Sequence, residues 1–198
     1  MDQLPPPPSH YEWVQEDPQV EEYQPPLPND IRISSLENFQ KEAHDLYRSA
    51  QPLPWHLTKL KKNGVDVVIN FALFPDLPLK KGPEHLIHIP SLGEYPSVDD
   101  VIDFLQVINY IRQREAAGEK HKILIHCIYG KDRTGLMAAA YQRVFEDRSI
   151  EEVEREYAYF GHTDFTYFEE LFGDPLKVEY FRNLSKETPK EKYLVSFW

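Results

Sequence analysis

Hydrophobic residues from about residue 46 onward follow two alternating periods. Four short runs rich in β-branched residues predict strands: a short edge strand at 46–48, then buried strands at 65–71, 85–89 and 122–126. Apolar residues at helical spacing separate these runs. Alternation of strand and helix along a chain is typical of an α/β layered domain.

Start and stop signals support the helical segments. A helix is expected between Pro54 and Gly64 because Pro favours the first turn and Gly ends a helix. Its apolar face is made by three leucines, Leu53, Leu57 and Leu60. Further helices are expected from a capping box near residue 97 to about 117, at 134–145, and from a second capping box to about 184. The two boxes are Ser97-x-x-Asp100 and Ser149-x-x-Glu152.

Residues 1–30 differ in composition from the rest of the chain. They hold eight of the 17 prolines and seven acidic residues, but no Lys or Arg. Such a sequence buries little apolar surface, so we expect an acidic, Pro-rich arm at 1–30 and one folded domain at 31–198. The run Pro5–Pro8 could bind the aromatic groove of a partner domain, and a spacer role is the preferred interpretation.

The net charge narrows the function classes. With 22 Lys and Arg against 33 Asp and Glu, the formal charge is -11, which argues against binding to nucleic acid or to an anionic membrane. No run approaches a membrane span and the N-terminus lacks signal-peptide features, so we expect a soluble cytoplasmic protein, with export by another route left open. Because Cys127 is the single cysteine, an intrachain disulfide and a cysteine-rich metal site are excluded.

That cysteine lies in the segment HCIYGKDRTGL, directly after the predicted strand at 122–126. A loop between a strand and a helix can direct successive backbone N–H groups inward, and the helix N-terminus adds partial positive charge, so the loop suits an anion. Gly130 allows a tight turn, and the planar fork of Arg133 matches two oxygens of a phosphoryl group. The loop residues expected to bind substrate are Ile128, Tyr129, Gly130 and Lys131.

The same positive field favours the thiolate of Cys127, which we expect to be a nucleophile near neutral pH. Its attack on phosphorus would form a cysteinyl-phosphate that water then hydrolyses. The Thr134 hydroxyl is placed to donate a hydrogen bond to the sulfur. His126 is expected to orient the loop from the strand side and so to contribute to substrate binding.

The segment resembles the Cys-x5-Arg signature loop of cysteine-dependent tyrosine and dual-specificity phosphatases, and its CxxGKDRTG form is similar to the atypical, often microbial, branch. The resemblance extends to YRSAQP, VDVVINF and the sequence after the loop, and covers roughly residues 46 to 162. It implies a tyrosine phosphatase-like α/β fold, with a compact, mostly parallel sheet flanked by helices. It also implies a shallower pocket than that of large phosphotyrosine-specific domains.

One element of the family pattern is missing. The family normally supplies an Asp on a separate loop to protonate the leaving oxygen, and the matching stretch IPSLGEYP at 89–96 contains none. Two acids remain as candidates: Glu94 on that loop, and Asp132, which resembles an Asp of some inositol-lipid phosphatases and is preferred. The alternatives are a solvated loop acid for Glu94 and a charge on the helix dipole for Asp132.

The positions of the lysines help to predict the substrate class. Lys131 resembles the added cation of phosphatases that act on inositol phosphates, with a solvated lysine as the alternative. Five other lysines would extend a basic rim if they lay near the pocket: Lys59, Lys61, Lys62, Lys80 and Lys81. His85 and His88 do not share a strand face and lack metal-ligand spacing, so we interpret them as structural and expect no metal or other cofactor.

The sequence therefore predicts a metal-independent phosphomonoester hydrolase. Its substrates would be phosphoinositides or inositol phosphates, or phosphotyrosine, phosphoserine and phosphothreonine in proteins. The main alternative is a phosphate-binding module with weak turnover, because the usual loop Asp is missing. A rhodanese-like sulfurtransferase ranks last, because its loop usually reaches Arg one residue sooner and lacks the RTG helix start.

Overall fold

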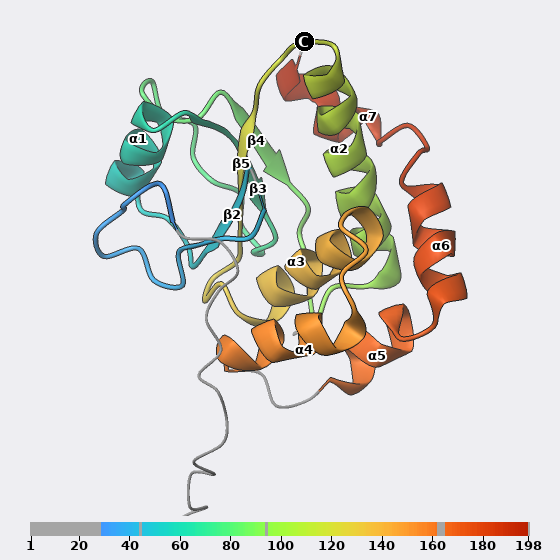
Figure 1. Cartoon of the computed structure of the whole chain (residues 1–198). Coiled ribbons are helices and arrows are strands. Elements are labelled where there is room, and N and C mark those ends of the chain that lie inside the picture. The colour runs from blue at the N-terminus through green and yellow to red at the C-terminus, as the bar shows by residue number, and fades with distance from the viewer. Residues whose placement is uncertain (1–28, 44, 94, 162–164, 198) are drawn as a thin grey trace, which may run out of the picture.

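The computed structural model describes residues 29–43, 45–93, 95–161 and 165–197 of the chain, so most of the predicted arm and the candidate acid Glu94 lie outside the described residues. A five-stranded sheet with helices on both faces forms the fold (Figure 1). The strands are β1 (Gln40–Lys41), β2 (Leu46–Ser49), β3 (Val65–Asn70), β4 (His85–His88) and β5 (Lys122–His126). The helices are α1 (Pro54–Lys62), α2 (Val98–Ala116), α3 (Asp132–Phe145), α4 (Ile150–Tyr159), α5 (Thr166–Phe172), α6 (Pro175–Leu184), α7 (Glu191–Leu194) and the 3-10 turn η1 (Val195–Phe197).

The strand order is β1-β2-β5-β3-β4, and every neighbouring pair is parallel except β1 with β2. The predicted mostly parallel α/β sheet is confirmed. The prediction of an edge strand at 46–48 was wrong, because the short antiparallel β1 covers the outer side of β2. The last strand in the sequence, β5, therefore lies between β2 and β3, and the segment that follows it leaves the middle of the sheet at its carboxyl edge.

Two hydrophobic cores cover the two faces of the sheet, as a parallel sheet requires. On one face, residues such as Ile69 and Ile125 pack against α2 and α3, and on the other, Val68 and Leu124 pack against α1. Figure 1 shows α1 on one side of the sheet and α2 and α3 on the other. The register of β3 on β5 shifts between Val65 and Val67, so a β-bulge interrupts the alternation of the strand at its start.

The capping signals formed as predicted for α2 and α4. Ser97 and Ser149 each accept a hydrogen bond from the backbone N–H three residues on, at 3.2 Å in both helices. A serine cap of this kind stabilises a helix by about 1 kcal/mol. In α1 the buried face is His56, Leu57 and Leu60, whereas Leu53 precedes the helix and is 43% exposed, so its predicted place on the apolar face was wrong.

The aromatic residues after α4 form part of the core. Phe168, Phe172 and Phe181 are buried, and the ring centroids of Phe172 and Phe181 lie 5.0 Å apart. The sequence did not indicate α7 or η1, which are short and held by packing against β4. Among the described residues no helix combines the length and apolar character needed to cross a membrane.

A buried polar network links the sheet to α3 and α4. The amide of Gln142 in α3 donates to Glu42 Oε2 at 3.0 Å and to Glu156 Oε1 at 2.7 Å, and Arg148 donates to Glu156 Oε2 at 2.7 Å. Burial and the nearby Glu156 raise the pKa of Glu42 well above its ordinary value. Although burial opposes ionisation of Glu156, hydrogen bonds from Glu42, Arg148 and Gln142 lower its pKa to about 2. Glu42 therefore carries the proton of the pair and Glu156 the charge.

This division of charge predicts unequal responses to the same substitution. Glu42→Gln, which resembles the protonated carboxyl, should cost about 1 kcal/mol or less at pH 7, whereas Glu156→Gln should cost about 2–4 kcal/mol because it leaves Arg148 without its partner. Urea unfolding of both variants measures the two costs.

The stabilisation from Glu156 is present above its ordinary pKa of 4.5 and is lost as the pH falls toward about 2, so the gap between Glu156→Gln and the wild type should narrow in acid. Equal costs for the two variants would contradict this charge assignment.

Candidate active site

The loop from Cys127 to Lys131 connects the end of β5 to the start of α3 at the carboxyl edge of the sheet. Ligands of open α/β sheets bind at this edge, where neighbouring connections diverge. Cys127 is 4% exposed at the base of the loop. The helix begins at Asp132, two residues before the predicted Thr134, so Asp132 and Arg133 lie in its first turn, where the backbone N–H groups have no helical partner.

Three consecutive carbonyl groups of the loop point outward, because donors from the segment around β1 and β2 hold them. These contacts are Gln51 N to Ile128 O at 3.0 Å, Asn38 Nδ2 to Tyr129 O at 2.7 Å, and Arg48 Nη2 to Gly130 O at 2.8 Å. In a trans peptide unit the N–H group points opposite to the C=O group. The N–H groups that follow these carbonyls therefore face the interior of the loop, and Gly130 N donates to Cys127 Sγ at 3.2 Å.

The turn at Gly130 requires a residue that has no side chain. Its φ of +68° lies in the left-handed region. A β-carbon at this position would also overlap the Ser49 carbonyl group and the Ala50 nitrogen, which belong to the backbone just after β2. The loop therefore packs backbone against backbone, and no side chain can be accommodated at residue 130 without moving one of the two segments.

Arg48 supports the loop from beneath. It is 1% exposed, its guanidinium carbon lies 3.6 Å from the centroid of the Phe160 ring, and its Nε lies 3.4 Å from Glu42 Oε1. It thus joins the loop to the buried network of Gln142. We predicted no role for Arg48, and the one available signal was a charged residue inside a short strand of otherwise buried residues.

His126, the last residue of β5, contacts the base of the loop and the segment after β3. Its Nδ1 lies 3.3 Å from Cys127 O, and its Nε2 lies 2.7 Å from Asp76 Oδ2, an acid on the segment after β3. Gln51 donates to the other oxygen of Asp76 at 2.7 Å. Burial favours the protonated form of Asp76, but the hydrogen bonds from His126, Gln51 and Asn70 outweigh it, so the pKa of Asp76 lies below its ordinary value. No sequence signal pointed to Asp76.

His126 is fully buried and directly precedes Cys127, so its ring links the base of the loop to the carboxylate of Asp76. This contact fixes the end of β5 from which the loop begins.

Arg133 Nε donates to Gly93 O at 2.9 Å, which brings the segment before α2 against the start of α3. Glu94 is the residue after Gly93 and lies outside the described residues. Asp132 is half-buried in the first turn of α3. The Thr134 hydroxyl is fully buried and has no hydrogen-bond partner among the described residues, so the predicted bond to Cys127 Sγ is not formed in this arrangement.

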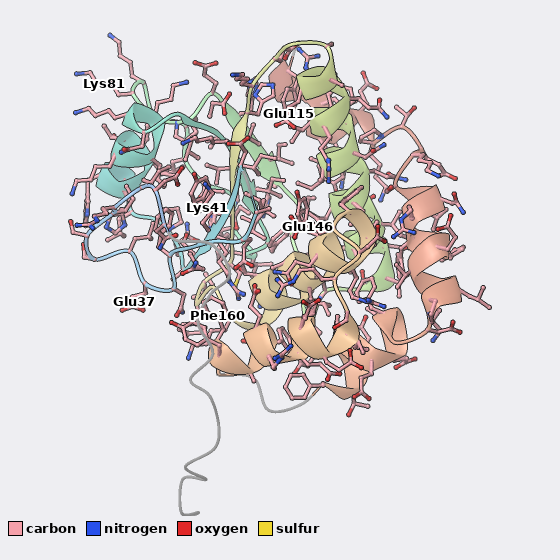
Figure 2. The ribbon with its side chains drawn as sticks, in the orientation of Figure 1. Glu37, Lys41, Lys81, Glu115, Glu146 and Phe160 are labelled. Carbon is pink, nitrogen blue, oxygen red and sulfur yellow. The ribbon has the colours of Figure 1, made fainter. Side chains whose placement is uncertain are left out.

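The five lysines that could have formed a basic rim do not lie near the loop. Lys59, Lys61 and Lys62 lie in the last turn of α1, just before β3 begins, and Lys80 and Lys81 lie before β4. These positions are at the amino edge of the parallel strands, opposite to the loop. Figure 2 labels Lys81 and Phe160, which are far apart along the strand direction. Lys131, in contrast, lies near Gly161, where a β-carbon would be 3.7 Å from its Nζ.

Exposed apolar side chains follow the strands at the same edge of the sheet as the loop. They come from the segments that leave the carboxyl ends of four strands. These residues are Leu53 after β2, Leu73 and Phe74 after β3, Leu92 after β4, and Ile128 and Tyr129 after β5. We call them the apolar rim. Leu92 is 84% exposed, Phe74 76% and Tyr129 68%, which is unusual for large apolar side chains gathered at one edge.

Comparison with known proteins agrees with this geometry. The model of the tyrosine phosphatase family matches residues 97–167. The dual specificity protein phosphatase TpbA of Pseudomonas aeruginosa strain PAO1 is 30% identical over 130 residues, which is 64% of this chain and 57% of that protein. The chain thus spans a little more than half the length of this curated relative.

Solved structures show the same fold. The core catalytic domain of the PP-IP phosphatase Siw14 from S. cerevisiae matches with a TM-score of 0.59 and 20% identity, over 78% of this chain and 98% of that chain. A crystal structure of P. aeruginosa TpbA in complex with pTyr matches with a TM-score of 0.52 and 23% identity, over 76% and 91%. With the signature loop at the carboxyl edge of the sheet, these matches agree on one resemblance: the chain is similar to the tyrosine phosphatase family and, within it, to the atypical dual-specificity-like phosphatases.

Proposed function

We propose that the protein is a phosphomonoester hydrolase that works through a cysteinyl-phosphate on Cys127. The observation that carries this proposal is the set of outward carbonyl groups at Ile128, Tyr129 and Gly130, which turns successive amides toward the space above Cys127 Sγ. A ring of inward amides at a helix N-terminus binds a dianionic phosphoryl group. The nucleophile lies at the bottom of that ring.

In the first step, the thiolate of Cys127 attacks phosphorus, the S–P bond forms and the bond to the leaving oxygen breaks. The loop amides and the guanidinium of Arg133 stabilise the charge on the three equatorial oxygens, where a trigonal transition state carries it. The amide of Gly130, which donates to Cys127 Sγ, favours the thiolate before attack. These groups supply positive charge without a metal ion, so we propose a metal-independent reaction.

In the second step, water attacks the phosphorus of the cysteinyl-phosphate, the S–P bond breaks and inorganic phosphate leaves. The buried Thr134 hydroxyl, which has no partner among the described residues, is available to donate to the departing thiolate. An acid must protonate the leaving oxygen in the first step and take a proton from water in the second.

Glu94 and Asp132 are the candidates for that acid. The contact between Arg133 Nε and Gly93 O supports Glu94, since it holds the residue before Glu94 against the phosphate-binding arginine. Asp132 occupies the first helical turn, where a carboxylate also stabilises the helix dipole without touching the substrate. We therefore revise the preference from Asp132 to Glu94.

The apolar rim supports a phosphoprotein substrate, phosphotyrosine in particular. A polyphosphorylated inositol needs several cations around the reacting phosphate, and the five candidate lysines are at the opposite edge of the sheet. An aromatic phosphoester on a peptide would instead contact exposed side chains such as Tyr129 and Leu92. The names of the relatives include both substrate classes: TpbA is a dual specificity protein phosphatase, and Siw14 is a PP-IP phosphatase.

Phosphate release tests the activity and the substrate class together. With a chelator present, the wild type should release inorganic phosphate from a phosphotyrosine peptide faster than from phosphoserine peptide, phosphoinositides or soluble inositol phosphates. Cys127→Ser should reduce release to the background rate because serine is not ionised at neutral pH.

Faster release from the inositol phosphates would overturn the phosphoprotein assignment and retain the mechanism. If the protein released phosphate from none of these substrates but still bound phosphate analogues, the result would favour the phosphate-binding module with weak turnover.

Gly130→Ala tests whether activity depends on the loop conformation that turns the carbonyl groups outward. The new methyl group would force the loop away from Ser49 and Ala50, and a displacement of about 1 Å should lower kcat/KM about a hundredfold or more. Gly118→Ala is the matched control, because Gly118 also has a positive φ, +104°, but a β-carbon there meets nothing within 4 Å. Both variants should lose about 1–2 kcal/mol of stability to backbone strain, and Gly130→Ala should lose more because its new methyl group also overlaps the backbone of Ser49 and Ala50. Equal activity of the two alanine variants would contradict the proposed cradle.

The pH dependence of kcat/KM distinguishes the two candidate acids. Glu94→Gln should lower kcat about a hundredfold or more and remove the alkaline decline of the pH profile, whereas Asp132→Asn should change kcat less than about tenfold. A substrate whose leaving group needs no proton, such as an aryl phosphate that releases a phenol of low pKa, should restore most of the activity of Glu94→Gln. If Asp132→Asn shows these effects instead, the assignment of the acid is reversed.

A further inference from the structure

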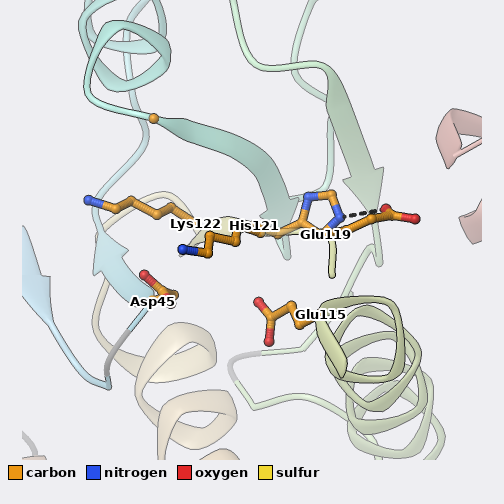
Figure 3. A pocket seen from close by; sticks show the side chains of 7 residues that line it. Asp45, Glu115, Glu119, His121 and Lys122 are labelled. Carbon is orange, nitrogen blue, oxygen red and sulfur yellow. Dashed lines mark hydrogen bonds and ion pairs between the residues drawn. The ribbon is translucent and has the colours of Figure 1, made fainter. Parts of the chain in front are cut away.

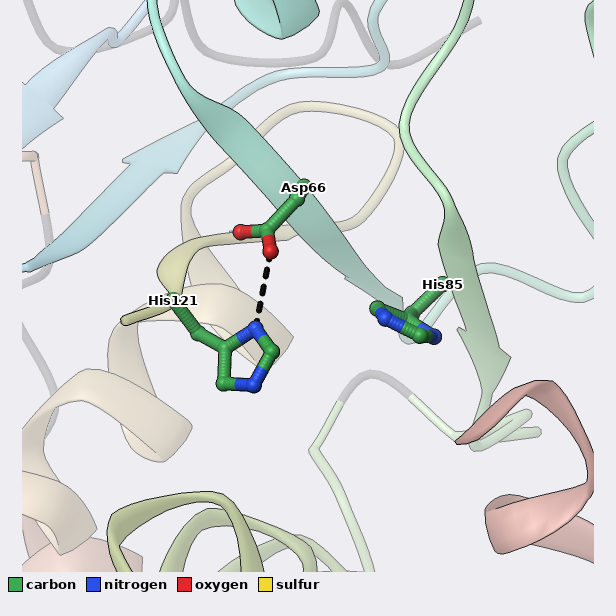
Figure 4. A group of neighbouring side chains, drawn as sticks. All are labelled: Asp66, His85 and His121. Carbon is green, nitrogen blue, oxygen red and sulfur yellow. Dashed lines mark hydrogen bonds and ion pairs between the residues drawn. The ribbon is translucent and has the colours of Figure 1, made fainter. Parts of the chain in front are cut away.

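A second group of chemically active side chains lies at the amino edge of the sheet, opposite to the signature loop. Asp66 of β3, His85 at the start of β4 and His121 just before β5 come together there, although far apart in sequence (Figure 4). One ligand atom from each residue lies within 4.8 Å of the others. Spacing in the sequence gave no such signal, because His85 was compared only with His88 on its own strand.

The β-bulge in β3 explains how Asp66 reaches this group. Val65 pairs with Lys122 and Val67 with Ile123, so Asp66 is the extra residue that no residue of β5 opposes. Bulges re-aim a side chain and are frequent beside functional sites. Here the bulge turns the carboxylate toward His121, whose Nδ1 lies 2.8 Å from Asp66 Oδ2.

We propose that Asp66, His85 and His121 bind a divalent transition-metal ion, with Zn²⁺ as the best fit. Two imidazoles and one carboxylate form a common donor set for this ion, with bonds of about 2.0–2.2 Å. Ligand atoms on a tetrahedral ion are about 3.4 Å apart, so the present separations require shifts of about 1 Å, and the ion replaces the proton between Asp66 and His121.

The surroundings of the group match those of a metal ligand shell. A ligating imidazole usually donates its second N–H to a carboxylate, and His121 Nε2 lies 3.2 Å from Glu119 Oε2. Arg114 donates to the same carboxylate at 2.9 Å, which holds it in place beside His121. Asp66 Oδ1 is likewise oriented, because it accepts from Lys122 N at 3.0 Å.

His85 and the access route complete the site. The His85 ring stacks on Phe197 of η1, with centroids 4.2 Å apart and planes inclined by 11°, which fixes the orientation of the ring. On the other side, a surface cavity of about 520 Å³ borders His121 and Glu119, with Asp45 and Glu115 also lining it (Figure 3). Lys120 and Lys122 also line the cavity, so its charge is mixed, and it serves as an access route to His121. The site does not depend on the proposed phosphatase reaction, since it lies at the other edge of the sheet.

Calorimetric titration of the full chain with ZnCl₂ tests the proposal. The titration uses the Cys127→Ser background, so that the thiol cannot bind the metal. We expect one ion per chain, a rise in melting temperature of about 5 °C at a hundredfold excess over Kd, and visible absorption bands with Co²⁺.

Three variants decide which residues hold the ion. His85→Gln should weaken zinc binding by more than about tenfold without altering the fold of the metal-free chain, and Glu119→Gln should weaken it about tenfold to a hundredfold through His121. The matched control is His88→Gln, on the same strand, where the imidazole contacts Ala72 O and binding should be unchanged. Absence of binding, or equal affinity in wild type and His85→Gln, would overturn the proposal.

Discussion

The outward rotation of three consecutive carbonyl groups after Cys127 is the constraint on which the site depends. A loop of this length would otherwise satisfy its amides internally or with solvent. Here donors from Asn38, Arg48 and Gln51 hold the oxygens, and the amides are left facing one point. A backbone that is arranged before substrate arrives pays no reorganisation cost during the reaction.

This constraint extends into the core through Arg48. A buried arginine is costly unless its charge and its hydrogen bonds are compensated. Arg48 is compensated in part by its bond to the loop carbonyl of Gly130 and by the face of Phe160, while its Nε lies 3.4 Å from the carboxyl of Glu42 without a hydrogen bond. Glu42 in turn shares Gln142 with Glu156 on α4, so the position of the loop is coupled to the packing of α3 against α4.

Local signals explain what could be predicted from the sequence. The strand and helix periods, the serine caps and the spacing of Cys127, Gly130 and Arg133 are short-range features, and the structure has the expected elements. The partners of the loop, such as Asn38 and Asp76, were not predictable because each is an ordinary polar residue whose role arises only from the strand order. The place of the five lysines was not predictable for the same reason, since helical position alone does not say which edge of the sheet a residue will reach. The group of Asp66, His85 and His121 likewise exists only once three strands are in register.

The position of β5 in the sheet also has a consequence for synthesis of the chain. β2 and β3 are made early but do not pair with each other, because β5 lies between them. Until Lys122–His126 leaves the ribosome, each has an open edge, and nothing can hold the loop, which is the next segment to emerge. The order of translation therefore delays the nucleophile until the sheet can close around it. A nascent chain that stops short of this point carries no reactive thiol.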